Sequence, residues 1–257
     1  MKFKTLTLLA LLVSCSSNAG LLTDFSGSLD SNLYLDIPNS VGSVSLNNSG
    51  TGTLDFSTTG FADMWQVRNN APFAWTDSPT VALNDTWYVE TKVSMPGTAN
   101  GRLAGLTFYG DVDGSFGEFT FAIDNWNNTP SVRLQGLGDN NPNVEGLILS
   151  SFNPSVYLRT AITELGAMDS YTFQYKAFEL DTWTTLTTKT FAVDNSRTAL
   201  FLKNNNNPSQ ASFDYFYVGT DSRDASTQFA EVPEPTTLTI FALGMIGLAS
   251  RRFKKQS

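Results

Sequence analysis

The sequence has 257 residues, of which 16% are charged, with a formal net charge of -8, and it contains no histidine. Without histidine, a Ser-His-Asp triad and histidine-bound zinc are excluded. The acidic balance argues against a nucleic-acid partner, because phosphate binding needs clustered lysine and arginine. The single cysteine, Cys15, allows no disulfide within the chain, so a folded domain must be stabilised by its packed core.

The N-terminal segment predicts export. Lys2 and Lys4 precede an apolar run over residues 6–13, which is too short to span a bilayer as a helix. Two cleavage hypotheses remain open. Residues 17–19 place small side chains where an ordinary signal peptidase cuts, which makes residues 1–19 a signal peptide with a short helix. Residues 12–15 instead resemble a bacterial lipobox, in which the signal ends at residue 14 and Cys15 is acylated.

Residues 20–222 predict one all-β domain. Residues 87–93, for example, alternate between an apolar face that contains Trp87 and a polar face that contains Glu90. Clusters of Gly, Asn, Asp and Pro separate the strands, and many short strands favour an antiparallel two-sheet β-sandwich over a fold that alternates strands and helices. The predicted strands are 87–93, 103–109, 118–124, 131–135, 156–162, 171–178, 183–187, 199–202 and 213–218.

The C-terminus carries a second set of targeting features. A linker over residues 223–231 leads into a segment over residues 232–257, in which a rigid Pro-Glu-Pro element precedes an apolar run at 238–249 and a basic end. The apolar run predicts a short hydrophobic helix, and the basic end would stay in the cytoplasm. The residues that define this segment are Val232, Pro233, Glu234, Pro235, Arg251 and Arg252.

This order of elements resembles the PEP-CTERM sorting tail of Gram-negative bacteria. The resemblance implies recognition and cleavage by an exosortase, a transpeptidase embedded in the membrane. It also implies transient anchoring of the chain in the inner membrane through the C-terminal helix, followed by placement at the cell surface or in an extracellular polysaccharide matrix. A plain C-terminal anchor is the alternative interpretation.

The middle of the chain resembles the concanavalin A-like lectin/glucanase superfamily, and within it the non-catalytic jelly-roll domains found beside β-xylosidases and the laminin-G-like domains. The resemblance rests on the order of short motifs at residues 24–26, 52–56, 88–93, 104–109, 157–159, 171–183 and 212–216. It implies two antiparallel sheets, one of them concave, and frequent glycan binding.

The carboxylates do not form the pattern of a glycan-cleaving enzyme. Such an enzyme needs two carboxylates across one bond, about 5–5.5 Å apart for retention of configuration. The Glu-x-Asp-x-Glu spacing of the superfamily's glucanases is missing, and Glu118 and Asp124 are too far apart along one predicted strand. We therefore expect a protein without enzymatic activity. One alternative is a hydrolase or lyase that uses Glu90 or Glu118, which would approach each other only on adjacent strands; another is a structural surface protein without a ligand.

Aromatic side chains beside amides and charged groups are candidates for sugar binding, because a flat ring stacks on a pyranose and polar groups bind its hydroxyls. The best single patch is the loop that holds Asn125, Trp126 and Asn127. Trp183 is a further candidate, whereas Trp87 and Trp75 are expected in the core. The full set of predicted binding residues is Trp65, Tyr109, Asn125, Trp126, Asn127, Arg133 and Gln135.

Calcium is the only metal that the sequence suggests, because it is bound by carboxylate and carbonyl oxygens. The resemblance to jelly rolls that pin their N-terminal segment to the last strand implies Asp24, Asp30 and Asp214 as ligands of a structural calcium. No other cofactor is expected. The expected partners are an exosortase, an extracellular polysaccharide and, transiently, the inner membrane.

Overall fold

A computed structural model describes residues 21–37, 42–47, 52–62, 71–97, 101–109, 119–125, 129–136, 144–149, 154–192, 196–205 and 207–223. The predicted signal segment with Cys15 and the predicted C-terminal helix lie outside these residues. The chain divides into two compact units, Met1–Thr220 and Asp221–Ser257, and the strands described here all belong to the first.

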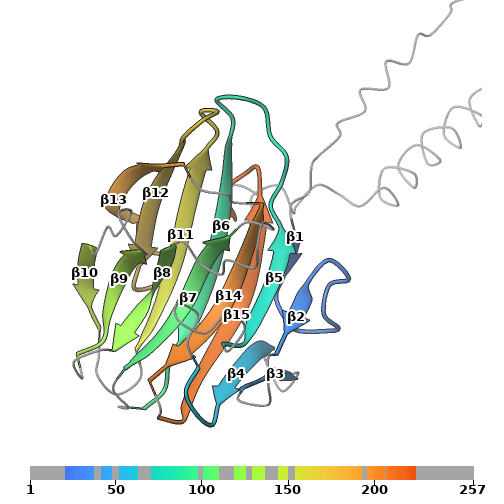
Figure 1. Cartoon of the computed structure of the whole chain (residues 1–257), viewed down its shortest axis with the longest axis vertical. Coiled ribbons are helices and arrows are strands. Elements are labelled where there is room, and N and C mark those ends of the chain that lie inside the picture. Colours follow the sequence, from blue (N-terminus) through green and yellow to red (C-terminus); the bar gives the residue numbers. More distant parts are fainter. Residues whose placement is uncertain are drawn as a thin grey trace, which may run out of the picture. The chain divides into compact units, whose positions relative to one another are not determined.

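The first unit is a sandwich of two antiparallel sheets (Figure 1). This confirms the fold predicted from the sequence. One sheet has eight strands in the order β13 (Thr184–Phe191), β12 (Asp169–Lys176), β11 (Ser155–Thr163), β6 (Thr86–Ser94), β15 (Ser209–Gly219), β4 (Thr53–Thr58) and β3 (Gly42–Asn47), with β1 (Leu21–Thr23) also pairing with β15. The other has seven strands in the order β10 (Val144–Ile148), β9 (Ser131–Gly136), β8 (Phe119–Asn125), β7 (Arg102–Tyr109), β14 (Arg197–Asn204), β5 (Phe73–Asp77) and β2 (Tyr34–Asp36).

The core between the sheets is aromatic. Trp87 is fully buried in it, as its place on the apolar face of β6 predicts. The ring of Phe119, on the seven-stranded sheet, lies 5.1 Å from Tyr171 and 5.5 Å from Phe173 across the sandwich, both edge-on. Since aromatic pairs add about 0.5–1.5 kcal/mol each beyond the area they bury, this cluster is a main source of stability in a chain that forms no disulfide.

A second apolar cluster lies on the opposite side of the seven-stranded sheet. Phe73 and Phe201 are fully buried there, on the neighbouring strands β5 and β14. Trp75 also belongs to this outer side, so its predicted place in the core is wrong. Its ring stacks on Tyr34 of β2 at 4.5 Å between centroids, and the Arg197 guanidinium lies 4.3 Å from its centroid.

Within the described residues, no helix has the length and apolar character needed to cross a membrane.

Candidate functional site

The outer face of the eight-stranded sheet carries a cluster of aromatic and charged side chains over β6, β11, β12 and β15. The strand register explains this gathering: Glu90 lies between Arg159 of β11 and Tyr217 of β15, and Lys92 lies between Tyr157 and Tyr215. Because alternate residues share a face, the polar side of each strand contributes to the same surface. We call this surface the polar face; its central residues are Tyr88, Glu90, Lys92, Tyr157, Arg159, Lys176, Trp183, Asp214, Tyr215 and Tyr217.

Trp183 covers the centre of the polar face. It comes just before β13, at the end of the β12–β13 loop, and its indole centroid lies 4.2 Å from the Arg159 guanidinium and 4.7 Å from the Lys176 ammonium. Arg159 in turn donates a hydrogen bond from Nε to Gln174 Oε1 at 2.8 Å. Arg159 lies on β11 and Lys176 ends β12, so contacts with both cations hold the partly exposed indole on the sheet.

Two of the three cations of the polar face are paired with carboxylates. Arg159 Nη1 lies 3.8 Å from Glu90 Oε1, and the Glu90 side chain is only 1% exposed. Lys92 donates a hydrogen bond to Asp214 on β15. Burial opposes the charged form of Lys92, but the hydrogen bond and the charge of Asp214 outweigh burial, and the pKa of Lys92 is raised. These ion pairs give the surface polarity without a large excess of either sign.

Hydroxyl and amide groups flank the charged centre. On β12 and β13, Thr172 and Thr188 are hydrogen-bonded at 3.1 Å, and Gln174 Nε2 donates to Thr185 Oγ1 at 3.3 Å. The two threonines and Thr185 remain at least partly exposed. A flat surface of this kind offers both donors and acceptors, which is the chemistry that sugar hydroxyls require.

Part of the predicted binding set falls on the other sheet. Arg133 Nη1 and Gln135 Nε2 both donate to Asp124 Oδ2, at 2.7 and 2.9 Å. Glu145 extends this network, because its carboxylate accepts hydrogen bonds from Ser131 at 2.7 Å and from Arg133 at 3.5 Å. The Ser131 hydrogen bond, aided by the charge of Arg133, lowers the pKa of Glu145. Arg133 and Gln135 therefore share Asp124 as a common acceptor, and their role in sugar binding stays a prediction.

Other predicted residues do not join that network in the described part of the chain. Asn125 follows Asp124 on β8, so strand alternation directs it to the other side of the sheet, where it is buried opposite Arg102. Tyr109 is the last residue of β7 and lies in register with Arg197. Trp65, Trp126 and Asn127 lie outside the described residues.

Of the acidic residues considered for catalysis, the structure describes Glu90, which belongs to β6 of the eight-stranded sheet and is buried. Glu118 lies outside the described residues, so the suggestion that it approaches Glu90 on an adjacent strand stays a prediction.

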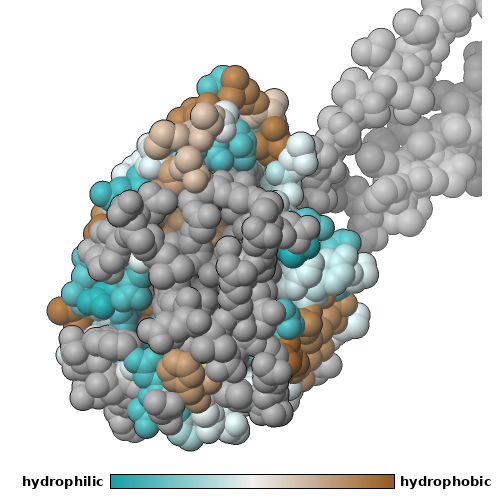
Figure 2. All heavy atoms as spheres, in the orientation of Figure 1, coloured by the Kyte–Doolittle hydropathy of each residue, from teal (hydrophilic) through white to brown (hydrophobic). Residues whose placement is uncertain are grey.

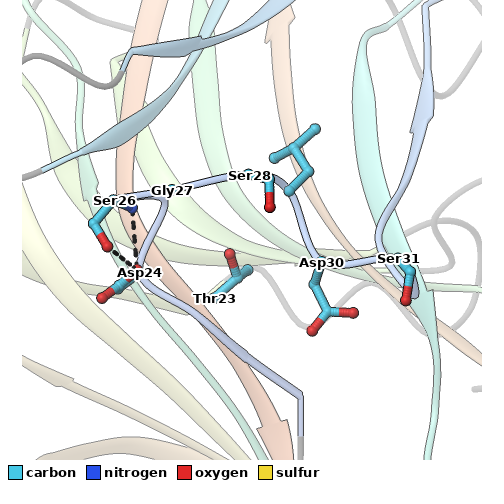
Figure 3. Close-up of a pocket in the computed structure, with 8 residues that line it drawn as sticks. Thr23, Asp24, Ser26, Gly27, Ser28, Asp30 and Ser31 are labelled. Carbon is cyan, nitrogen blue, oxygen red and sulfur yellow. Dashed lines mark hydrogen bonds between the residues drawn. The ribbon is translucent and has the colours of Figure 1, made fainter.

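The predicted calcium ligands are divided between two places. Asp24 and Asp30 line one open pocket of about 550 Å³ in the loop after β1 (Figure 3). Asp24 Oδ1 accepts hydrogen bonds from the hydroxyl and the backbone N–H of Ser26, which lower the pKa of Asp24, whereas Asp214 is engaged by Lys92. In the described part of the chain, no three acidic, histidine or cysteine side chains are grouped as metal ligands. Calcium binding stays a prediction.

Comparison with known proteins supports both halves of this description. Residues 231–255 match the PEP-CTERM protein-sorting motif, which includes every sorting residue predicted above. A search of curated proteins found no significant relative.

Solved structures are similar in fold over most of the chain. They include a bifunctional GH43-CE protein of Bacteroides eggerthii (15% identity, TM-score 0.59, covering 79% of this chain and 26% of that one). A xylan β-1,4-xylosidase of Bacillus halodurans matches at 17% identity and a TM-score of 0.53, covering 77% and 38%. The CBM2 module of the evolved Dit of Lactobacillus casei BL23 phage J-1 matches at 12% identity and 0.50, covering 78% and 94%. The chain thus spans only about a quarter to two fifths of the two enzymes, and the concanavalin A-like fold is the feature it shares with these structures.

Proposed function

We propose that this chain, whose C-terminal residues carry a PEP-CTERM sorting motif, is an exported envelope protein that binds extracellular polysaccharide through the polar face of its sandwich, without cleaving it. The observation that carries the proposal is Trp183, a partly exposed indole that Arg159 and Lys176 hold on the polar face. An aromatic ring fixed in this way presents a rigid stacking surface, which lowers the entropy cost of binding.

The surroundings of Trp183 suit a polysaccharide. Gln174 and Thr185 offer amide and hydroxyl groups beside the ring. Lys92 and Arg159 are paired with carboxylates, so the net charge near the ring is small, which favours a neutral or weakly charged chain over a strongly charged one. Similar folds occur in a CBM2 module and in a xylan β-1,4-xylosidase, and this likeness supports a carbohydrate ligand.

The absence of catalysis is part of the proposal. Glu90 and Asp214 are the carboxylates at the centre of the polar face, and each is held by a cation. Both carboxylates are therefore engaged within the protein, whereas glycan cleavage needs two carboxyl groups placed across the scissile bond. Incubating the protein with the same polysaccharides that it binds, and finding reducing ends released, would overturn this part alone.

The sorting motif supports a route to the cell envelope. In this scheme the N-terminal signal exports the chain, the apolar part of the tail holds it in the inner membrane, and an exosortase then cleaves the tail. Mass spectrometry of the product recovered from the source bacterium tests the route. A mature protein that lacks residues after the Pro-Glu-Pro element is expected, and an intact C-terminus on the surface-exposed protein would contradict it.

The binding experiment uses affinity electrophoresis in gels that contain xylan, β-glucan or dextran. The native chain should be retarded in at least one of them. Trp183→Ala should weaken binding roughly thirtyfold, since loss of an aromatic anchor typically costs about 2 kcal/mol, whereas Trp183→Phe should retain part of it. Phe178→Ala is the matched control, because Phe178 is on the same loop and is more exposed.

Two results would sink the proposal: no retardation in any gel or on a glycan array, or binding that Trp183→Ala leaves unchanged. Trp126→Ala tests the binding loop predicted from the sequence in the same gels. Binding that depends on Trp126 and not on Trp183 would move the ligand to that loop and away from the polar face.

A further inference from the structure

One end of the sandwich carries exposed apolar side chains. Leu83, in the loop between β5 and β6, is 63% exposed, and Leu165 and Met168, in the turn between β11 and β12, are 46% and 47% exposed. Figure 2 shows hydrophobic residues at the top of the molecule, where Figure 1 draws these two connections. We call these three side chains the apolar cap. They are neighbours, because a side chain added at Gly166 would come within 3.8 Å of Leu83.

The apolar cap stands on a well-fixed base. The two loops are joined by backbone hydrogen bonds from Asn84 N to the Glu164 carbonyl at 2.7 Å and from Glu164 N to the Asp85 carbonyl at 3.1 Å. The turn is also fixed from within, since Leu165 N donates to Asp169 Oδ1 at 3.1 Å. Exposing apolar side chains to water costs free energy, and a flexible loop can reduce that cost by folding inward. The ordered base of the apolar cap prevents this, so its three side chains stay exposed.

Both directions of the chain leave the sandwich at this same end. β15 ends at Gly219, opposite Tyr88, near the start of β6. β1 begins at Leu21, opposite Val218. The segment toward the N-terminal signal and the segment toward the sorting motif therefore both start beside the apolar cap.

We propose that the apolar cap lies against a lipid surface while the sorting tail holds the chain in the membrane. The inference rests on the membrane step of the proposed function. Seventeen residues lie between Thr220 and Leu238, where the apolar run of the sorting tail begins, and a fully extended chain of that length reaches at most about 65 Å. A sandwich on this tether stays within reach of the bilayer, and burying apolar side chains at the interface favours the orientation in which the end that carries the tether faces the lipid.

The charges near the cap select the kind of lipid. Asp77 and Asp85 are exposed and Glu164 is partly exposed. Arg197 is the cation beside them, 3.8 Å from Asp77. A surface with this balance is repelled by anionic headgroups, so the partner is a zwitterionic surface such as phosphatidylethanolamine.

The test uses the full chain with Cys15→Ser, reconstituted in vesicles of zwitterionic lipid. An environment-sensitive fluorophore is attached at Leu83→Cys or Leu165→Cys, and at Leu180→Cys as the matched control. Leu180 is 98% exposed and lies in the β12–β13 loop, at the opposite end of those strands. We expect a shift of emission to shorter wavelength and quenching by lipid-borne quenchers at positions 83 and 165, but not at 180, and a weaker effect when anionic lipid is added.

Flotation of the vesicles distinguishes membrane anchoring by the sorting tail from lipid contact of the apolar cap. A chain that does not float with the vesicles contradicts both the membrane step and the apolar cap. A chain that floats while positions 83 and 165 stay as unquenched as position 180 overturns only the cap, and so does equal quenching at all three positions. Quenching that appears only when exosortase is present in the membrane would assign the cap to a protein partner and overturn the lipid assignment.

Discussion

Replacing Arg159 with methionine should destabilise the sandwich, because Glu90 stays buried and loses the cation that lies 3.8 Å away. Breaking a buried ion pair by removing one partner costs about 3–5 kcal/mol. Because the Arg159 side chain is 11% exposed, we expect a loss of stability at the low end of this range, about 3 kcal/mol. The lost contact with the Trp183 ring adds about 0.5–1 kcal/mol.

A double-mutant cycle separates the ion pair from simple loss of packing. Glu90→Gln together with Arg159→Met removes both charges, so the double variant should be more stable than the sum of the single variants predicts, by about 1 kcal/mol or more. Urea unfolding at pH 7, followed by tryptophan fluorescence, measures all four proteins. Arg197→Met is the matched control, because Arg197 also lies 3.8 Å from a carboxylate and packs on a tryptophan, but its partner Asp77 is 73% exposed. Its removal should cost less than about 1 kcal/mol beyond the ring contact. Single-variant effects that add within about 0.5 kcal/mol, or equal losses for Arg159 and Arg197, would refute the reasoning.

Two further predictions concern stability. Gly105→Ala should destabilise strongly, by about 3 kcal/mol or more, because the new Cβ would lie 2.4 Å from the Phe121 carbonyl oxygen; Gly27→Ala, with no atom within 4 Å, should change the free energy of unfolding by less than about 0.5 kcal/mol. The pKa of Glu145 is lowered from 4.5 chiefly by the Ser131 hydrogen bond, so its contribution is present above that pH and is lost as the pH falls through the lowered pKa. Glu145→Gln should therefore cost a few tenths of a kcal/mol at pH 7, the carboxylate being largely solvated, and nothing well below pH 4; equal losses at both pH values would contradict this.

Many strands in the middle of the chain could be predicted because apolar and polar residues alternate along each of them. β6 (Thr86–Ser94) is the predicted strand 87–93 extended by one residue at each end, and its apolar side faces the core. The predicted strands did not include β1 to β5 or β10. β3 (GSVSLN) and β10 (VEGLI) are edge strands with half-exposed side chains, so neither has the apolar face that makes a strand visible in a sequence. Alternation also predicts that residues share a face without saying which side of the sheet is the core, which is how Trp75 was misplaced.

The candidate site was harder to predict, because it depends on pairings between strands far apart in the chain. Trp183, Arg159 and Glu90 meet only because β6 pairs with β11, and β11 with β12. One signal was available: Trp183 closes a loop between two strands with alternating patterns, and such a hairpin must fold its loop residues beside the ends of those strands. That Arg133 and Gln135 share a face could be predicted, because both residues lie on one strand and are two positions apart.

The two outer faces of the sandwich explain why the polar face is the better candidate for binding. On the seven-stranded sheet, Phe73 and Phe201 are fully buried, so the part of that outer side over β5 and β14 forms a second apolar layer. On the eight-stranded sheet, the outward tyrosines are buried as well, but Trp183 remains partly exposed among exposed threonines that can pair with sugar hydroxyls. The partly exposed indole beside these hydroxyl groups is therefore what makes the polar face the better candidate.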